Sequence, residues 1–527
     1  MKFDEVLKVL GEFGPYQKRI YLLLCLPAYP LCALHKLVWV FVGAIPQYRC
    51  STIIDEVFNN SLPYHLPEPI LNFTIPFLTK NKIDSCHYYV MNETLANDLP
   101  IDSILLTEWP GILQNISTGK SQKCSSYVYD KSVYQNSVVS DFNLVCDYNW
   151  QRALVQSLFM AGEFLGSLVA GTISDKFGRR RVFFTACIFQ AVFGILSGIV
   201  SNYYLYLIFR ALVGLFTPGV FLVGFVIGLE LVGPSRRLFA GIGCQFFFAT
   251  GYLLAAGAAY LIREWQYLQI AISVPGLLFL SYWWFIPESA RWLLAKKKLK
   301  DAKILLGKVA QENGTKLPEN FEEPDLHSTA KEEDNPLLLF KYPNLRKKFV
   351  NSGVYYGLAL NTSNLGGNDY VNFVIAAALE FPAYIFCILA LNRLGRRNPL
   401  SGWLLIAGSS LIVTSFLNDE NSRALIILAM IGKFGITISY AVIYIFSAEL
   451  YPTVVRNLGM GMSSTCARLG GIIAPFVILL ADVNRALPLV VFGIAAVLAG
   501  ILALFLPETR GANLPDTLEE GEQFGKS

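Results

Sequence analysis

Ionisable side chains inside long apolar runs of the sequence could bind a charged ligand. Charge is costly within a membrane-length segment unless the side chain lines a cavity or has a partner of opposite charge. Glu380 and Arg468 lie nearest to the middle of their runs, so we expect these two to face an ionic ligand. The other candidates of this kind are His35, Lys36, Glu163, Arg210 and Lys433.

Position along the run gives three of these basic residues a simpler explanation. Arg210 and Lys433 lie toward one end of their runs, where a long side chain can extend to the membrane surface or join a charged lock. Lys36 is seven residues from Gly43, so it too could reach the surface. Lys36 nevertheless remains a candidate ligand contact.

Aromatic rings on the same runs could surround an organic cation, because a cation is attracted to the face of a ring. Since 13% of the chain is aromatic, most rings must simply pack. The sequence has four histidines and no glycine-rich phosphate loop or Cys/His metal spacing, so we expect no catalysis, metal or cofactor. The aromatic candidates are Phe221, Phe225, Phe248, Tyr355, Tyr356 and Tyr440.

A densely charged turn lies between two of the apolar runs. Asp175 to Arg181 supplies one carboxylate, one glycine and four cations, and must lie outside the hydrocarbon. Asp175 is placed to accept hydrogen bonds from a helix N-terminus and from an arginine. A copy that lacks the acid begins at Asn392, 217 residues later.

Other pairs repeat at nearly the same offset, which predicts two halves of parallel topology. Glu230 precedes Arg237 by seven residues, as Glu449 precedes Arg456, and Pro-Glu-Ser at 287–289 is matched by Pro-Glu-Thr at 507–509. We expect Glu230 to pair with Arg236 or Arg237 in a gate that locks the halves together; a basic loop that only sets topology is the alternative. The gate candidates are Gly171, Asp175, Gly178, Arg179, Arg180, Glu230, Arg237, Arg393, Arg396, Glu449 and Arg456.

Eleven apolar runs are long enough to cross a membrane, and 54% of the residues are hydrophobic while only 16% are charged. A twelfth span is needed to place both basic turns on one side. The segment from Phe349 to Gly367 offers only Phe349 to Leu360 as a continuously apolar stretch, about 18 Å of helix. The sequence therefore predicts an all-α membrane protein of twelve helices whose seventh helix is short.

Lys and Arg gather on one side of these spans, which the positive-inside rule makes cytoplasmic. We expect a multi-pass plasma-membrane protein with both termini inside. Its predicted order is a cytoplasmic N-terminus (1–19), a six-helix half (20–286), a linker (287–348), a second half (349–506) and a tail (507–527). The early part of the linker, basic from Lys296 to Lys308, could form helices on the membrane surface, whereas Glu319 to Asp334 is acidic and equally well a solvated linker.

The polar segment 45–150 is predicted to be extracellular. Sequons and an even number of cysteines in one outer segment favour glycosylation and two disulfides, with three pairings open. The segment could also mediate a homo-oligomer. The residues are Asn59, Asn72, Asn92 and Asn115, and Cys50, Cys86, Cys124 and Cys146.

Gly171 to Arg181 resembles the signature loop of the major facilitator superfamily. Phe13 to Gln17, Pro287 to Leu293 and Ala448 to Arg456 resemble the organic cation/anion/carnitine transporter family, and the resemblance covers nearly the whole chain. His35-Lys36-Leu37 and the tail at 514–522 look like the insect organic cation transporter proteins.

The resemblance implies transport of a small organic ion by alternating access, with substrate and lipid as partners and no nucleic acid. The family's acidic position falls on Glu380. In the eleventh span, cation carriers of the family have Asp at the position of Arg468, whereas anion and carnitine carriers have Arg there. The resemblance therefore admits zwitterions as substrates beside cations, with organic anions as the alternative. The family's remaining cavity positions fall on Phe221, Phe225, Gln245, Phe248, Tyr355 and Tyr440.

The seventh span also departs from the family. Relatives have a longer apolar segment before Asn351, whereas here Arg346-Lys347-Lys348 directly precedes Phe349. About half a helix is missing by comparison, which makes a transport-inactive isoform the second alternative.

Overall fold

The computed structural model describes residues 3–57, 64–66, 68–79, 82–91, 117–318, 369–417, 422–450, 456–484 and 486–510. The chain forms two compact units. We call one the helical unit (Met1–Val40, Ala153–Leu261 and Gln266–Ser527) and the other the cysteine domain (Phe41–Arg152 and Ile262–Trp265). The predicted seventh span lies outside the described residues.

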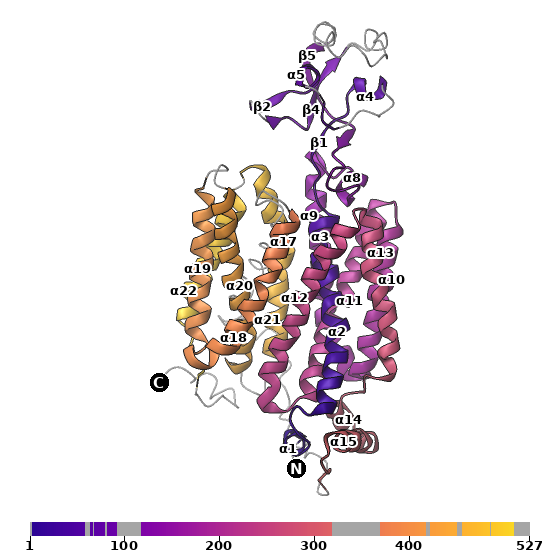
Figure 1. Cartoon of the computed structure of the whole chain (residues 1–527), viewed down its shortest axis with the longest axis vertical. Helices are drawn as coiled ribbons and strands as arrows, with labels where there is room; N and C mark the ends of the chain where they lie inside the picture. The colour runs from indigo at the N-terminus through magenta and orange to yellow at the C-terminus, as the bar shows by residue number, and fades with distance from the viewer. Residues whose placement is uncertain are drawn as a thin grey trace. The chain divides into compact units, whose positions relative to one another are not determined.

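The first half of the helical unit contains long helices that are apolar on most faces, as expected of membrane spans. Figure 1 shows them running side by side. They are α2 (Pro15–Leu37), continued by α3 (Trp39–Val42), α9 (Asn149–Phe177), α10 (Arg179–Ile199), α11 (Tyr203–Leu231), α12 (Arg237–Leu261), and α13 (Trp265–Leu278) with the 3-10 turn η3 (Phe279–Trp284).

The second half has helices of the same kind. Across the described residues, eight segments are long and apolar enough to span a membrane, and α13, α19 and α21 take the places of the other three predicted runs. The helices are α17 (Asp369–Ala378), α18 (Glu380–Leu394), α19 (Arg397–Ser415), α20 (Ser422–Leu450), α21 (Arg456–Ile478) with η8 (Leu479–Asp482), and α22 (Ala486–Leu504).

Glycines let helices approach closely within each half. A Cβ on Gly166 of α9 would collide with the backbone carbonyl of Leu215 on α11. Gly408 and Gly493 face each other across α19 and α22, and a Cβ on either would lie within 3.0 Å of the other's carbonyl oxygen. Small residues at helix contacts are the usual means of packing helices in a membrane.

Three shorter helices pack together at the end of the helical unit that carries the turn Asp175 to Arg181, which we call the basic end (Figure 1). They are α1 (Phe3–Val9), α14 (Ala290–Ala295) and α15 (Leu299–Asn313). Val6 and Leu10 pack there against Trp292 and Leu306 in one apolar cluster. This cluster stabilises the start of the first span against the linker.

The cysteine domain contains short strands, which the sequence did not predict. β1 (Tyr48–Cys50) pairs with β6 (Tyr127–Tyr129), β2 (Phe77–Thr79) with β3 (Lys82–Ile83), and β4 (His87–Met91) with β5 (Ser117–Lys123), all antiparallel. The short helices are α4 (Ile53–Val57), α5 (Glu68–Thr74), α8 (Val138–Asp141) and the turn η1 (Cys146–Tyr148).

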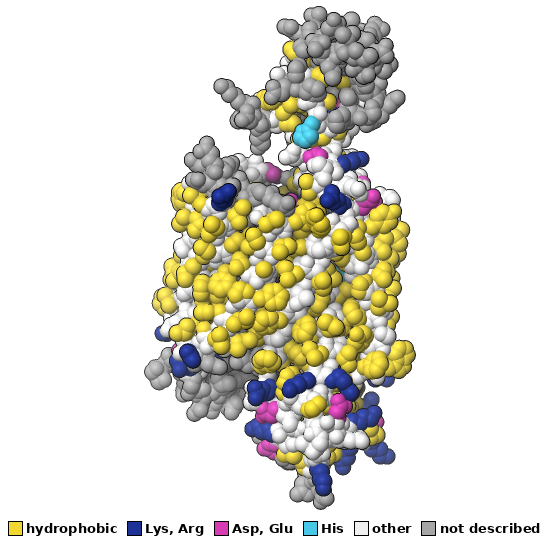
Figure 2. Space-filling model, in the orientation of Figure 1, with side chains coloured by type: hydrophobic (Ala, Val, Ile, Leu, Met, Phe, Trp, Pro, Cys, Tyr) yellow, Lys and Arg dark blue, Asp and Glu magenta, His cyan; other side chains and the backbone are white. Residues whose placement is uncertain are grey.

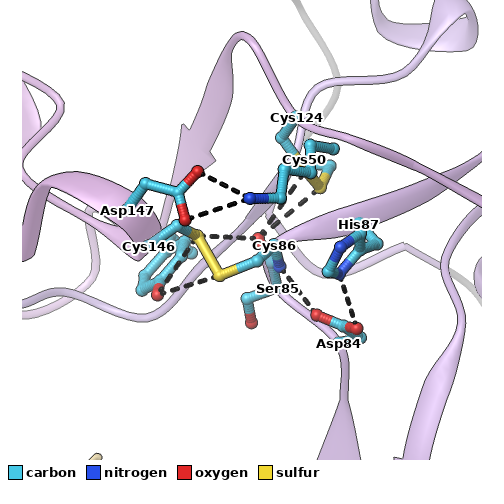
Figure 3. A network of polar contacts seen from close by, with 10 residues as sticks. Cys50, Asp84, Ser85, Cys86, His87, Cys124, Cys146 and Asp147 are labelled. Carbon is cyan, nitrogen blue, oxygen red and sulfur yellow. Dashed lines mark hydrogen bonds and ion pairs between the residues drawn. A yellow bond between two sulfur atoms is a disulfide. The ribbon is translucent and has the colours of Figure 1, made fainter.

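Two disulfides hold this domain together, Cys50–Cys124 and Cys86–Cys146, so the expected bonds are present and their pairing is resolved. Each closes a loop of at least 60 residues, which restricts the unfolded chain strongly. The carbonyl oxygen of Ser85 lies 3.5 Å from the sulfur of Cys50 and 3.9 Å from that of Cys146 (Figure 3).

Buried and exposed polar groups complete the domain. Arg49 binds Asp55 through two contacts of 2.7 Å, and both side chains are buried. Of the predicted glycosylation sites, Asn72 is exposed on α5, whereas Asn59, Asn92 and Asn115 lie outside the described residues.

Candidate functional site

Glu380, the first residue of α18, is fully buried and forms an ion pair with Lys433 of α20. The Nζ of Lys433 lies 3.0 Å from Oε1 of Glu380, and the hydroxyl of Tyr384 donates to Oε2 at 3.2 Å. Lys433 is itself only 3% exposed, so the alternative that its side chain extends to a membrane surface is wrong. A buried carboxylate with a buried lysine avoids the cost of an isolated charge.

Aromatic rings of α12 lie against this ion pair. Nζ of Lys433 is 5.5 Å from the ring centre of Tyr252, and that ring meets Phe373 edge-on at 4.3 Å. One turn or more earlier on α12, Phe246 contacts Tyr384 at 5.6 Å between ring centres. Helix α12 belongs to the first half, so the ion pair of the second half lies at the contact between the halves.

A second aromatic group joins helices of the first half. Phe221 of α11 meets Tyr29 of α2 at 5.1 Å and Phe248 of α12 at 6.1 Å. Phe225 and Gln245 are half-buried on the same two helices, α11 and α12. These four predicted cavity residues therefore lie on α11 and the first half of α12, and α12 also carries the Tyr252 ring that faces Lys433.

The other predicted ligand contacts are placed less closely. Arg468 is half-buried on α21 and Tyr440 is half-buried on α20, whereas Tyr355 lies outside the described residues.

Lys36 is engaged in an ion pair that the sequence did not reveal. Its Nζ lies 2.6 Å from Oε2 of Glu163 on α9, and both side chains are buried. Arg210 of α11 is also fully buried, donating at 2.8 Å to the carbonyl of His35 and lying 4.4 Å from the ring of Phe159. Neither basic residue reaches a membrane surface, so that alternative is wrong for both.

Three of the predicted gate residues of the first half, Asp175, Arg179 and Glu230, form one cluster at the basic end. Arg179 bonds Asp175 at 2.7 Å and Glu230 at 3.0 Å, and Ser289 donates to the same carboxylate of Glu230. Glu230 thus pairs with Arg179, which belongs to the charged turn itself.

Glu288 has the role that we expected of Asp175 at a helix N-terminus. Its carboxylate accepts from the backbone amides of Arg179 and Arg180 at 3.0 and 3.1 Å, where α10 begins. An anion at this position satisfies free amides and opposes the positive end of the helix dipole. Gly178, with φ of +107°, turns the chain so that these amides meet Glu288.

The second half repeats this arrangement. Glu508 accepts from the amides of Arg396 and Arg397 at 2.8 and 3.0 Å, and Gly395 has φ of +83°. Arg393 is exposed, and its carbonyl accepts from Arg510. The side chains of Glu449 and Arg456 lie outside the described residues.

Sequence reasoning missed Glu288 and Glu508 as functional candidates. Both were noted only as a repeated Pro-Glu pair, although Gly-Arg-Arg at 178–180 and 395–397 repeats at a similar offset. Because the glycine turn and the acid both recur at nearly the same offset, the sequence did contain a signal that they form one unit.

The helical unit has the major facilitator fold. A xylose symporter of this superfamily, XylE, in complex with 6-bromo-6-deoxy-D-glucose, aligns with a TM-score of 0.57 over 95% of this chain and 99% of its own, at 16% identity. An inward open structure of XylE from E. coli gives 0.58 over 71% of this chain and 89% of its own, at 17% identity. These likenesses show the fold of the helical unit.

Sequence comparison defines the family. The family model described as "Sugar (and other) transporter" matches residues 115–520. The Organic cation transporter protein of Drosophila melanogaster is 46% identical over 100% of this chain and 95% of its own length. The human Organic cation/carnitine transporter 2 is 35% identical over 98% of this chain and 93% of its own. The chain belongs to the organic cation and carnitine transporter family of the major facilitator superfamily.

Proposed function

We propose that this transporter carries small organic cations and zwitterions across the plasma membrane by alternating access. The observation that carries the proposal is the buried Glu380–Lys433 pair beside the aromatic rings of α12. A zwitterion can offer a cationic group to Glu380 and a carboxylate to Lys433, so it can bind without leaving either buried charge unpaired.

The relatives support this substrate class. They are named for organic cations and for carnitine, and carnitine carries both charges on one small molecule. Half-buried Arg468 adds a second cation to the same half, which supports carboxylate-bearing substrates over simple cations. That positive excess also favours organic anions as a second candidate.

Contacts between the halves support alternating access. Ser157 of α9 donates to the carbonyl of Ile472 on α21 at 2.8 Å, and Tyr370 donates to the carbonyl of Ala259 at 3.3 Å. These contacts lie on the parts of the helices far from the basic end, whereas the Glu288 and Glu508 clusters are each built within one half. A movement that breaks these contacts between the halves and brings the Glu288 and Glu508 clusters together would open a site near Glu380 to the side opposite the basic end. The reverse movement would open the site to the basic end.

The distribution of charge indicates the orientation of the protein in the membrane. Lys and Arg side chains gather below the hydrophobic belt in Figure 2, and we assign that basic end, with both termini, to the cytoplasm.

Uptake into cells that express the chain tests the function. The panel comprises a quaternary ammonium cation, a betaine-type zwitterion and an aromatic carboxylate. We expect zwitterion uptake to be lost in both Glu380→Gln and Arg468→Gln, and cation uptake to be lost only in Glu380→Gln. Uptake of the carboxylate alone would favour the anion alternative, and no uptake by protein verified at the cell surface would refute carrier function.

A further inference from the structure

Helix α15 has two faces of opposite character. Ala302, Leu306 and Val309 are buried in the apolar cluster with α1, α2 and α14. On the other side, Lys300, Ile304 and Lys308 follow one another at intervals of four residues, so they form one exposed stripe. Ile304 is 61% exposed between these lysines. An exposed apolar side chain among lysines is the pattern of a helix that lies in a membrane interface.

The exposed face carries a strong excess of positive charge. Six exposed lysines lie on or next to α14 and α15, and together with Ile304 we call them the lysine surface: Lys296, Lys297, Lys298, Lys300, Lys303 and Lys308. The same stretch has two acidic residues, Asp301 and Glu312, and the latter is bound to Arg19 at 2.8 Å. The surface is therefore basic overall.

The lysine surface is fixed to the first membrane span. The side chain of Asn313 donates to the carbonyl of Leu10 and to Oε1 of Gln17, each at 2.8 Å, and accepts from the amide of Tyr16 at 3.1 Å. Tyr16 and Gln17 are in the first turn of α2. Since α15 is tied to the beginning of a span, its lysines are held close to the level where the membrane ends.

Aromatic residues mark the membrane boundary near the same place. Trp284 is 80% exposed and Phe285 is 63% exposed, at the end of the sixth span and a few residues before α14. Exposed Trp and aromatic rings of this kind lie at the level of the headgroups. Figure 2 shows Lys and Arg side chains directly below the hydrophobic belt and again on the group of helices beneath it.

We propose that the lysine surface binds the anionic headgroups of phospholipids in the adjacent leaflet. The ammonium groups meet the phosphate and carboxylate charges, and Ile304 enters the interface between them. Clusters of four to eight basic side chains on an amphipathic helix next to a membrane span are suited to such headgroups.

The two halves do not share this surface, so it is no requirement of the repeated fold. After the last span, Pro507-Glu508-Thr509-Arg510 leads into a tail that contains Asp516, Glu519, Glu520 and Glu522 and a single lysine, Lys526. A lipid bound to the lysine surface would therefore act on the first half alone, through α15 and the start of α2.

Lipid selectivity around the intact protein tests the proposal. The full-length protein is reconstituted in phosphatidylcholine vesicles that contain spin-labelled phosphatidylserine or spin-labelled phosphatidylcholine, and the immobilised fraction of each is measured. The test variant combines Lys300→Gln, Lys303→Gln and Lys308→Gln, and the matched control replaces the same three residues with arginine. All three side chains are exposed, so we expect neither variant to change the unfolding midpoint. An unchanged midpoint then verifies that the variants are folded.

We expect the wild type to prefer phosphatidylserine, with a preference that weakens at high salt. The glutamine variant should lose most of it, with an upper limit of about fivefold for each lysine, and the arginine control should retain it. Equal preference in the wild type and the glutamine variant would overturn the proposal, as would its loss in the arginine control.

A further variant addresses the acidic linker segment as a competing occupant. It neutralises Glu319, Glu322, Glu323 and Asp325. If the wild type shows no preference for phosphatidylserine and this variant gains one, the linker occupies the surface and the lipid proposal is wrong. Unchanged preference in this variant supports the lipid.

Discussion

Replacing Gly178 with alanine is expected to destabilise the protein by breaking the link between Glu288 and the N-terminus of α10. Gly178 has φ of +107° and ψ of 144°, a region that is almost restricted to glycine and costs other residues about 1–3 kcal/mol. The new Cβ would also lie 2.5 Å from Oε2 of Glu288, so the carboxylate must move.

Moving the carboxylate removes its hydrogen bonds to the amides of Arg179 and Arg180. Loss of a helix cap costs about 0.5–2 kcal/mol. Together with the backbone strain, the expected loss is about 1.5–5 kcal/mol. The measurement is the thermal unfolding midpoint of the purified protein in detergent, compared at one heating rate because unfolding of large membrane proteins is often irreversible.

Gly171→Ala is the matched control. Gly171 lies in α9 near the same turn, and a Cβ there would meet no atom within 4 Å. Alanine in a helix reduces the freedom of the unfolded chain, so this variant should keep or raise the midpoint by the equivalent of about 0.4–1 kcal/mol. If Gly178→Ala unfolds at the same temperature as Gly171→Ala, the inferred link between Gly178 and Glu288 is wrong.

Four other predictions concern the second half and the charged turn Asp175 to Arg181. Gly395→Ala should lower the unfolding midpoint as Gly178→Ala does, because its Cβ would lie 2.6 Å from Oε2 of Glu508; a smaller fall would mean that the halves are stabilised differently. Burial raises the pKa of Glu508, but the backbone amides that donate to its carboxylate outweigh burial and lower the pKa overall. The stability that Glu508 contributes to the folded protein is therefore complete above the pKa of an unfolded glutamate, about 4.3, and is lost as the pH falls through the lower pKa of the folded state. The midpoints of the wild type and Glu508→Gln should therefore converge in acid, and a constant difference would contradict this. Lys433→Gln should cost about 3–5 kcal/mol by leaving Glu380 buried alone, and the double variant with Glu380→Gln should unfold at a higher temperature than Lys433→Gln. Asp175→Asn should leave the midpoint nearly unchanged, since the carboxylate is 68% exposed. It should nevertheless slow uptake more than any single substitution in the copy of this turn that begins at Asn392, because that copy lacks the acid; equal effects would contradict this.

Hydropathy and internal repetition predicted the helical unit well. An apolar run of this length forms a helix in a membrane because only a helix satisfies all of its backbone hydrogen bonds within the segment, so the positions of the helices follow from hydropathy. The cysteine domain was less predictable, because β5, with the sequence of Ser117 to Lys123, has no alternation of apolar and polar residues. Its two disulfides followed from the cysteine count, but their pairing depended on the folded chain.

The interior ion pairs could not be predicted because they depend on how each helix is rotated. Glu380 and Lys433 are 53 residues apart on different helices, and hydropathy does not say which faces meet. The same reason hid the contact of Glu288 with residues 108 and 109 positions earlier. In both cases the residue type suggested a charge in need of a partner, and only the packing supplied that partner.

The two buried lysine–glutamate pairs have different surroundings, and this difference bears on which one can respond to transport. Lys36 and Glu163 join α2 to α9 inside the first half. Lys433 and Glu380 belong to the second half, but the ring of Tyr252 that faces Lys433 comes from the first. A rigid movement of one half against the other would leave the first pair unchanged and would move an aromatic ring away from the second. Under the proposed alternating access, the environment of Glu380 and Lys433 would therefore change as the halves move, whereas that of Lys36 and Glu163 would stay fixed within one half.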